Sequence, residues 1–191
     1  MISGPSGAGK STVISRLLKQ RPDIFFSVSF TTRAPREGEV DGVNYNFVDK
    51  TEFERMIAAD EFLEYAQYVE NYYGTSLKVI QEKIEAGTDV LLDIEVQGAS
   101  KVRVKCPEAV TIFLMPPSLE ELRNRLCARN TDEESVILRR LEEAKREYKE
   151  IPLYDYLVIN DKVECAVNEM ASILKAEECR LKNRAYLIEG V

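Results

Sequence analysis

Short apolar runs separated by amphipathic stretches form the main hydrophobic pattern of the 191-residue chain. Residues 90–94, 110–115 and 156–160 are mostly apolar, and residues 24–29 form a further run. Such runs, with helical patterns between them, predict strands of a parallel sheet that is buried on both faces. Only three residues precede the first glycine, so the first strand is expected to be either trimmed at its start or unusually short.

Helical patterns occupy the intervals between these runs. Leu77, Ile80 and Ile84 recur at i, i+3 and i+7, and the Gly87 that follows predicts the end of that helix. Capping boxes of the form Ser/Thr-x-x-Glu predict where three other helices begin, and they are Thr51 with Glu54, Ser118 with Glu121 and Thr131 with Glu134. These three helices are predicted to span residues 51–59, 119–129 and 132–149. Two further helices are predicted over residues 10–19 and 162–184.

These elements predict an α/β fold in which a central parallel sheet is flanked by helices. Residues 30–80 and 118–150 are more polar than the rest of the chain, and we expect them to be inserted into the core. The core then consists of residues 1–29, 81–117 and 151–191. The length of the chain predicts that all of these parts belong to a single domain.

The amino-acid composition excludes several classes of function. The chain has no histidine, which excludes Ser-His and Cys-His hydrolases and histidine-based metal sites. Its net charge of −7 argues against a partner that is a nucleic-acid polymer, and no apolar run is long enough to span a membrane. Four scattered cysteines without a C-x-x-C pair favour a reducing compartment, so we expect a cytoplasmic protein. Residues 1–36 nevertheless carry six basic residues and one acid, which suggests a small anionic ligand.

A phosphate-binding loop lies within this basic segment. Residues 4–11 match the P-loop pattern G-x-x-x-x-G-K-[ST], whose glycines let consecutive backbone N–H groups face a phosphate. Lys10 is expected to reach the β- and γ-phosphates, and the Ser11 hydroxyl to ligate Mg²⁺. The residues predicted to bind the nucleoside triphosphate here are Gly4, Pro5, Ser6, Gly7, Ala8, Gly9, Lys10, Ser11 and Thr12.

Candidate acceptor groups follow the second predicted strand. Arg33 and Arg36 flank Pro35 and can clamp a phosphate monoester with bidentate hydrogen bonds, to which Tyr45 can add a phenolic donor. Taken alone, two such arginines are more typical of a solvated surface than of a phosphate site. Asp93 closes an apolar run, where a carboxylate can hold Mg²⁺ or its water ligands or can simply begin a loop.

The P-loop together with residues 29–48, SFTTRAPREGEVDGVNYNFV, resembles the guanylate kinase family of P-loop kinases. The resemblance continues through residues 61–64, 71–75 and 92–98 and ends near Asn160. It implies Mg²⁺-dependent transfer of the γ-phosphoryl group of ATP to GMP or dGMP, giving ADP and GDP in purine nucleotide metabolism. It also implies that residues 30–80 form a GMP-binding region and residues 118–150 a helical lid.

The resemblance assigns roles to individual acceptor residues. It implies that the GMP phosphate is held by Arg33, Arg36, Tyr45 and Tyr73, with Glu39 supporting the arginines. It implies that Ser29, Glu64 and Thr75 read the guanine base, and that Asp93 and Glu95 lie between the metal and the acceptor. The chemistry agrees, because guanine presents N1–H and N2–H₂ as adjacent donors that one carboxylate accepts together, and adenine lacks this pair.

The lid residues are assigned in the same way. Arg125 and Arg129 stand at i and i+4 of a predicted helix, and the charged hairpin around them is by itself typical of an exposed, ion-paired surface. The resemblance implies that Arg125, Arg129 and Arg140 act with Lys10 on the transferring phosphates, and that Asn160 lies near the adenine of ATP.

Two alternatives differ from this interpretation. One is a P-loop kinase for another acceptor, which the arginine turn and Glu64 disfavour. The other is a catalytically silent scaffold domain that grips a phosphorylated peptide, which the intact P-loop and the lid arginines disfavour. We therefore expect ATP and GMP as substrates, with no nucleic-acid polymer or membrane as partner. The chain is expected to be a monomer or a small homo-oligomer.

Overall fold

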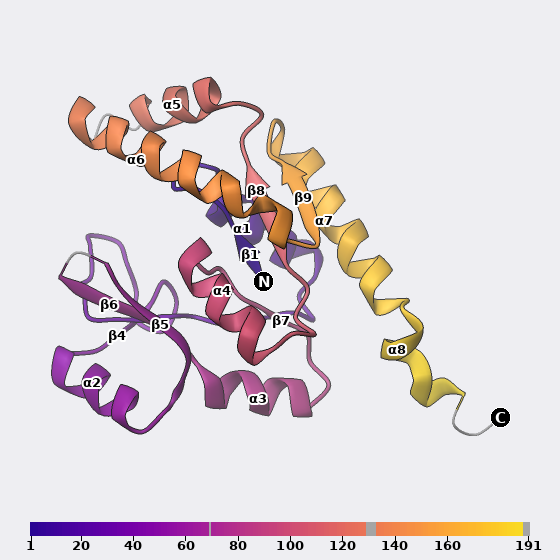
Figure 1. The fold of residues 1–191 in the computed structure, drawn as a ribbon. Helices are drawn as coiled ribbons and strands as arrows, with labels where there is room; N and C mark the ends of the chain where they lie inside the picture. Colours follow the sequence, from indigo (N-terminus) through magenta and orange to yellow (C-terminus); the bar gives the residue numbers. More distant parts are fainter. Residues whose placement is uncertain (69, 129–132, 189–191) are drawn as a thin grey trace. The chain divides into compact units, whose positions relative to one another are not determined.

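The computed structural model describes residues 1–68, 70–128 and 133–188 (Figure 1). The chain divides into two compact units, which we call the acceptor unit (Met1–Ser3 and Pro22–Ile112) and the P-loop unit (Gly4–Arg21 and Phe113–Val191). Within the described residues, none of the helices combines the length and the apolar character that crossing a membrane requires.

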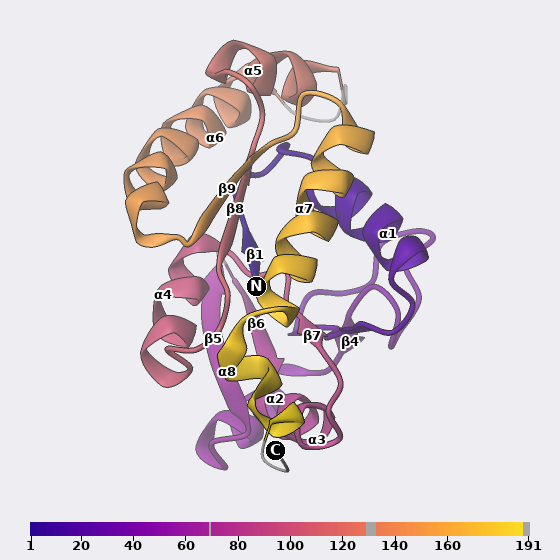
Figure 2. The same ribbon diagram turned by 90° about the vertical axis from the view of Figure 1, so that its right-hand side faces the viewer.

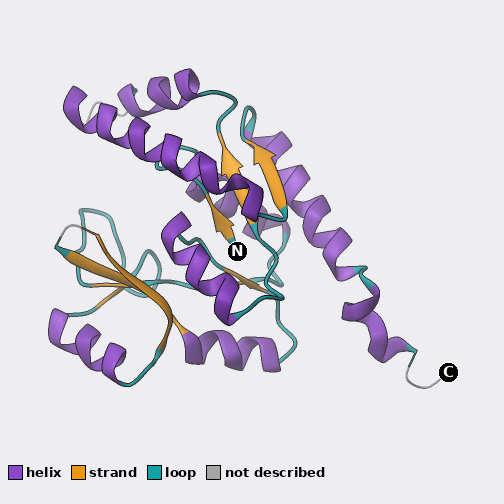
Figure 3. Ribbon diagram, viewed as in Figure 1, coloured by secondary structure: helices purple, strands orange, loops and turns teal. Residues whose placement is uncertain are grey.

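The acceptor unit is built around a mixed four-stranded sheet in the order β4-β3-β6-β5, in which only the β3–β4 pair is parallel (Figure 3). A separate parallel pair is formed by β2 and β7. The elements of this unit are β1 (Ile2–Ser3), β2 (Phe25–Phe26), β3 (Phe30–Thr31), β4 (Asn46–Phe47), α2 (Lys50–Ala58), β5 (Phe62–Tyr68), β6 (Asn71–Ser76), α3 (Leu77–Glu85), β7 (Val90–Leu91) and α4 (Val96–Lys105).

Two apolar clusters stabilise this unit. Phe53, Met56 and Phe62 form one of them between α2 and the sheet, and the Phe53 ring stacks on that of Phe62 with centroids 4.4 Å apart. The other joins β5, α3, the segment that follows β7, and α4, and its members are Leu63, Ile80, Leu92, Ile94 and Val102. Both clusters include a residue of β5, so that strand is fixed on both of its faces.

The hairpin of β5 and β6 is the largest element that the hydrophobic pattern failed to predict. The two strands pair antiparallel, with an irregularity between Phe62 and Glu64. A bulge of this kind breaks the alternation of inward and outward residues by which a strand is recognised in a sequence. Both Leu63 and Glu64 are buried in consequence, and the segment reads as neither a helix nor a regular strand.

Helix caps in this unit were predicted in part. The helix α3 ends as predicted, with Gly87 at a positive φ of 73° and its N–H donating to the Ile84 carbonyl. The prediction that Thr51 caps a helix is wrong, because the cap lies two residues before it and α2 begins at Lys50. Its cap is the side chain of Asp49, which accepts a hydrogen bond from the N–H of Glu52. A carboxylate at this position satisfies an N–H group that has no partner within the helix.

In the P-loop unit, α1 (Lys10–Gln20) packs on α7 (Val163–Glu178), and Figure 2 shows the two helices side by side. The strand β8 (Ile112–Met115), whose first residue ends the acceptor unit, pairs with β9 (Tyr156–Ile159). Leu122, Leu126, Ile137 and Ala144 form an apolar cluster between α5 and α6. The other elements are α5 (Leu119–Cys127), α6 (Glu134–Glu147), the 3₁₀ helix η1 (Tyr148–Leu153), α8 (Leu181–Arg184) and the 3₁₀ helix η2 (Ala185–Leu187).

Two helix predictions change in this unit. The Ser118 cap is confirmed, since its side chain accepts from the N–H of Glu121, whereas Thr131 lies outside the described residues. The predicted helix 162–184 is two helices, because Arg180, with φ −60° and ψ 137°, is extended and separates α7 from α8. The buried Glu177 accepts hydrogen bonds from Tyr156 and Arg180 and anchors this break.

Candidate functional site

A buried carboxylate lies on the hairpin of the acceptor unit. Glu64 on β5 pairs with Thr75 on β6, and the hydroxyl of Thr75 donates a 2.7 Å hydrogen bond to Oε1 of Glu64. Glu64 is 8% exposed and Thr75 is 1% exposed. An acid that is held this firmly in the interior has one oxygen committed to the protein and can present the other to a ligand.

Burial has an electrostatic consequence for Glu64. Loss of water around the carboxyl group raises the pKa of Glu64 above its ordinary value of 4.5, while the hydrogen bond from Thr75 and the charge of Lys101 oppose that rise. A buried carboxylate is stabilised when a ligand donates hydrogen bonds to it, because these replace the solvation that it lost. The site therefore favours a ligand with hydrogen-bond donors at this point.

The arginine turn is organised by one carboxylate. Nη2 of Arg33 donates to Oε1 of Glu39 at 2.9 Å, and the backbone N–H of Arg36 donates to Oε2 at 2.7 Å. The hydrogen bond from Arg33, together with that from the backbone of Arg36, lowers the pKa of Glu39 below 4.5. Glu39 thereby fixes the guanidinium of Arg33, whereas Arg36 is exposed.

Two tyrosines complete this end of the acceptor unit. The guanidinium carbon of Arg33 lies 5.5 Å from the ring centre of Tyr45, whose centroid is 6.0 Å from that of Tyr73. Burial raises the pKa of Tyr45, and the nearby Tyr73 and the charge of Asp93 add to that rise. The structure thus brings Arg33, Tyr45 and Tyr73 together, with Asp93 near enough to affect Tyr45.

Ser29 and Asp93 lie at strand ends in the same unit. Ser29 immediately precedes β3, is partly buried, and accepts a backbone hydrogen bond from Asn46 of β4. Asp93 follows β7, forms a parallel bridge with Ile2 and is partly buried. Asp93 lies past the carboxyl end of its strand, where polar side chains can meet a ligand.

In the P-loop unit, glycine is required at the turn that precedes α1. Gly4, Gly7 and Gly9 have φ values of 150°, 94° and 92°, which residues with a side chain rarely adopt. A side chain at Gly4 would lie 2.0 Å from the Leu114 carbonyl oxygen, and one at Gly9 would lie 2.4 Å from Nδ2 of Asn160. The loop is therefore shaped by its own backbone and packed closely against its neighbours.

Lys10 begins α1, and its ammonium group donates to the carbonyl oxygens of Gly4 and Pro5. Ser11 and Thr12, in the first turn of the helix, are exposed. Backbone N–H groups in this turn have no partner within the helix, and they favour an anion at this end of α1.

Arg125 of α5 is attached to the same loop. It donates from Nη1 to the Ala8 carbonyl at 3.4 Å and from Nη2 to the Asn160 carbonyl at 2.8 Å, and its Nε donates to Glu121 at 2.7 Å. The buried Asn160 donates from Nδ2 to the same Ala8 carbonyl at 2.8 Å. One loop carbonyl therefore links the P-loop to a predicted lid residue and to the residue after β9.

Comparison with known proteins assigns the family. The guanylate kinase family profile matches residues 1–177. The guanylate kinase of Desulfitobacterium hafniense is 48% identical over 191 residues, which are all of this chain and 96% of that relative. The guanylate kinase of Halalkalibacterium halodurans is 53% identical over 189 residues, or 99% of this chain and 91% of the relative.

A solved structure agrees with these relatives. The crystal structure of guanylate kinase from Anaplasma phagocytophilum has a TM-score of 0.77 and 37% sequence identity, covering 94% of this chain and 85% of that one. The chain belongs to the guanylate kinase family. The family resemblance and the α/β fold class predicted from the sequence are therefore confirmed.

Two further residues are expected of a guanylate kinase lid, Arg129 and Arg140. Arg140 lies on α6 and is partly exposed. Arg129 lies outside the described residues. Exposed pairs such as Arg123 with Glu134 and Lys145 with Glu142 join the two helices or lie along one of them, as the charge pattern of this hairpin predicts.

Two residues that act on candidate site residues, one in each unit, were not predicted from the sequence. Lys101 of α4 donates to the Tyr65 carbonyl at 2.5 Å and acts electrostatically on Glu64. Glu121 holds Arg125. The i, i+4 spacing of Glu121 and Arg125 is a signal that was available in the sequence, whereas no local pattern links Lys101 to a strand 36 residues earlier.

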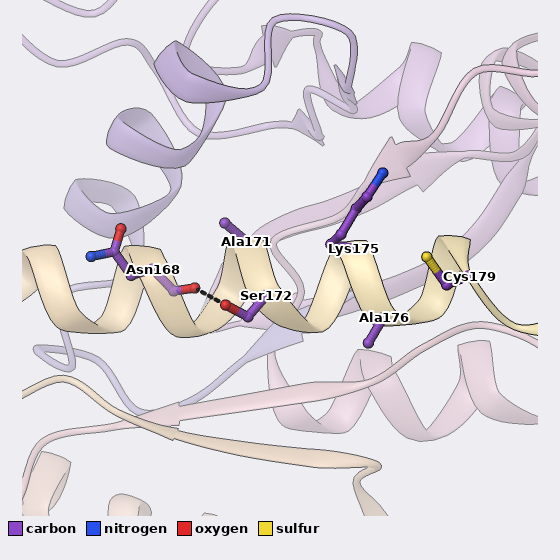
Figure 4. A pocket seen from close by; sticks show the side chains of 6 residues that line it. All are labelled: Asn168, Ala171, Ser172, Lys175, Ala176 and Cys179. Atoms are coloured by element: carbon purple, nitrogen blue, oxygen red, sulfur yellow. Dashed lines mark hydrogen bonds between the residues drawn. The ribbon is translucent and has the colours of Figure 1, made fainter.

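A hollow along α7 involves none of the residues expected to bind nucleotides (Figure 4). It is lined by Asn168, Ala171, Ser172, Lys175, Ala176 and Cys179. The Ser172 hydroxyl donates to the Asn168 carbonyl within the helix at 2.8 Å. The lining residues lie along α7, with Cys179 as its C-cap, so the hollow is formed by one helix and its end.

Proposed function

We propose that this chain carries out the guanylate kinase reaction with GMP held by the acceptor unit and ATP held by the P-loop unit. The reaction itself, phosphorylation of GMP by ATP, follows from membership of the guanylate kinase family. The observation that supports the assignment of the acceptor is the buried Glu64 held by Thr75. Its free oxygen can accept from the N1–H and N2–H₂ groups of guanine, whereas AMP would leave a buried charge without donors.

The GMP phosphate is proposed to meet the arginine turn. Arg33 is oriented by Glu39 and lies against the ring of Tyr45, so its outward donors are held ready for phosphate oxygens. Arg36, Tyr45 and Tyr73 are proposed to add further donors, and Ser29 to contact the base. In this arrangement the GMP-binding region is residues 30–80, and Asp93 and Glu95 lie beyond it in the same unit.

ATP is proposed to bind with its phosphates on residues 4–12. Lys10 starts α1 and can turn from the loop carbonyls to the β- and γ-phosphates. Arg125, Arg129 and Arg140 of the lid, residues 118–150, are proposed to neutralise the charge of the transferring group. Asn160 supports the loop through Ala8 and is proposed to lie beside the adenine.

Mg²⁺ fits the donors that the chain offers. The exposed hydroxyl of Ser11 and the carboxylate of Asp93 are hard oxygen ligands of the kind that Mg²⁺ takes, often through water. When bound, the ion neutralises negative charge on the β- and γ-phosphate oxygens. We propose Ser11 and Asp93 as the groups that would hold it.

No strong general base is needed for this reaction. The attacking atom is a phosphate oxygen of GMP, which is already anionic near neutral pH. The protein's part is to align the two phosphates, neutralise charge with Lys10 and the arginines, and exclude water that would otherwise hydrolyse ATP. This chemistry agrees with a chain that contains no histidine.

ATP and GMP are proposed as the substrates in the cytoplasm, without a nucleic-acid polymer or membrane as partner, and with the chain acting as a monomer or a small homo-oligomer. An assay of ADP release with GMP, dGMP, AMP and CMP in turn tests the substrate assignment. GMP and dGMP should be preferred by a factor of about 10⁴ over AMP, as in sites that hydrogen-bond a group the competitor lacks. Equal rates with AMP would contradict it.

A variant assigns that preference to one side chain. Glu64→Gln should lower kcat/KM for GMP about a hundredfold, because the amide cannot accept from both guanine donors with a charged oxygen. Glu85→Gln, at an exposed acid on α3 of the same unit, is the matched control and should leave the preference unchanged. Retained preference in Glu64→Gln would place base recognition elsewhere.

A further inference from the structure

Gly98 is a buried glycine inside a helix whose backbone does not require glycine. It is the third residue of α4, and its φ is not in the left-handed region. Glycine in a helix interior lowers helix stability relative to alanine. A buried glycine at such a position therefore points to a neighbour that comes too close for any side chain.

That neighbour is the carboxyl group of Glu64. A Cβ atom at position 98 would lie 2.6 Å from Oε2 of Glu64 and 3.1 Å from its Cδ. It would also lie 2.6 Å from Cγ2 of Ile94, a member of the apolar cluster around β5. Carbon and oxygen atoms that are not bonded are not found this close, so a side chain here would displace the carboxyl group.

Glu64 has little freedom to accommodate such a displacement. Its Oε1 is held by Thr75 at 2.7 Å, its side chain is buried, and its backbone is paired in the hairpin. The backbone of β5 is also held from the side of α4, where Lys101 and Lys105 donate to the carbonyls of Tyr65 and Phe62. Any shift would have to break the hydrogen bond from Thr75 or rotate Oε2, the oxygen left for a ligand.

We propose that Gly98 is a positioning residue for guanine selectivity: the absence of its side chain leaves the space in which Glu64 holds its carboxylate. This inference rests on the proposed function, because it assigns Glu64 to the guanine base. A purely structural role for Gly98 would alter folding and both nucleotide sites alike. A positioning role alters recognition of GMP alone.

The test is the Gly98→Ala variant with steady-state kinetics for both nucleotides. We expect KM for GMP to rise at least tenfold and the preference for GMP over AMP to fall at least tenfold. The kcat at saturating GMP should stay within threefold and KM for ATP within twofold. Alanine itself favours a helix, so a loss of selectivity cannot come from weakened helix propensity. Gln97→Ala, at the exposed neighbouring position of α4, is the control and should change none of these values.

The Gly98→Ala substitution in a protein that already carries a Glu64 substitution distinguishes an effect on the Glu64 carboxylate from a general effect on packing. In Glu64→Ala protein, which has no carboxyl group for a side chain at position 98 to displace, adding Gly98→Ala should change KM for GMP less than twofold. A full tenfold effect in that background would overturn the inference, and so would unchanged GMP selectivity in the single variant. If the unsubstituted protein shows no preference for GMP, the proposed function fails instead, so the two failures are distinguishable.

The contact with Ile94 is controlled separately, in case Gly98→Ala folds poorly. Ile94→Ala removes Cγ2 and hence the apolar contact, while the contact with Glu64 remains. The Ile94→Ala/Gly98→Ala pair, checked for folding by circular dichroism, should still lose selectivity at least tenfold relative to Ile94→Ala alone. Equal selectivity of these two proteins would contradict the proposal.

Discussion

The two units hold their candidate sites by different means. In the acceptor unit, side chains hold side chains: Thr75 holds Glu64, and Glu39 holds Arg33. In the P-loop unit, the loop is shaped by glycines, and side chains hold its backbone, as Asn160 and Arg125 do at Ala8. A site made of side chains can discriminate between bases, whereas a site made of backbone N–H groups recognises phosphates whatever base they carry.

The largest expected effect tests the P-loop side of this comparison. Lys10→Ala should lower kcat by about three orders of magnitude, because one preorganised positive group on the transferring phosphate is removed. Lys19→Ala, at the exposed far end of α1, is the control and should stay near the unsubstituted rate. Coupled ADP-release kinetics measure both variants, and substantial turnover by Lys10→Ala would contradict the P-loop assignment.

A smaller effect is expected where one side chain only orients another. Glu39→Gln removes the charge that fixes Arg33 and should raise KM for GMP about three- to tenfold, with little change in KM for ATP. Glu37→Gln, two residues earlier and exposed, serves as its control. If KM for ATP rose as much as KM for GMP, the proposal that each unit binds a different nucleotide would be wrong.

In the P-loop unit, the Asn160→Ala variant tests whether the Asn160 side chain stabilises the backbone of the P-loop. Asn160 is 2% exposed, and its amide donates to Ala8 at 2.8 Å, so its loss should lower the free energy of unfolding by about 1–3 kcal/mol. Urea unfolding measures this loss, and KM for ATP should rise while KM for GMP stays unchanged. Asn168→Ala, at an exposed position on α7, is the control. Unchanged stability of Asn160→Ala would show that the loop does not depend on this bond.

The smallest expected effect is a stability change with pH at Glu64. Burial raises the pKa of Glu64 above 4.5, so the folded protein keeps this proton to higher pH than the unfolded chain does. The unfolded chain binds fewer protons in the interval above 4.5, and the contribution of Glu64 to stability therefore falls as pH rises through it. Glu64→Gln has no such proton.

At pH 8 without nucleotide, Glu64→Gln should melt above the unsubstituted protein, and the difference should shrink as pH falls toward 4.5. Melting curves across this range, with Glu85→Gln as the exposed control, measure it. A difference that grew at low pH would show that the ionised form of Glu64 is the favoured one in the folded protein.

The same contrast explains how much of each site could be predicted from the sequence. The P-loop is contiguous and its glycines are required by local backbone geometry, so its turn and the following helix α1 were predicted from the pattern alone. The acceptor residues were predicted through a family resemblance, because Glu64 on its own is one acid among many. Its partner Thr75 is 11 residues away across a hairpin that the bulge conceals.

Contacts between segments that are far apart in the chain could not be predicted from local sequence patterns. Arg125 reaches Ala8 across 117 residues and Asn160 across 35, and no spacing rule links such positions. The cap of α2 was misplaced for a different reason, since Asp49 and Thr51 are both good caps and only the observed backbone shows which one is used. The structure adds these choices to what periodicity and motifs already predict.

In the proposed arrangement, each unit recognises its own nucleotide. Titration calorimetry of GMP into Lys10→Ala protein measures this separately from turnover, because the substitution lowers kcat and leaves every residue of the acceptor unit unchanged. The dissociation constant for GMP is predicted to stay within twofold of that of the unsubstituted protein. A loss of GMP affinity of tenfold or more would contradict this arrangement, because it would mean that the P-loop lysine contributes to binding of the acceptor.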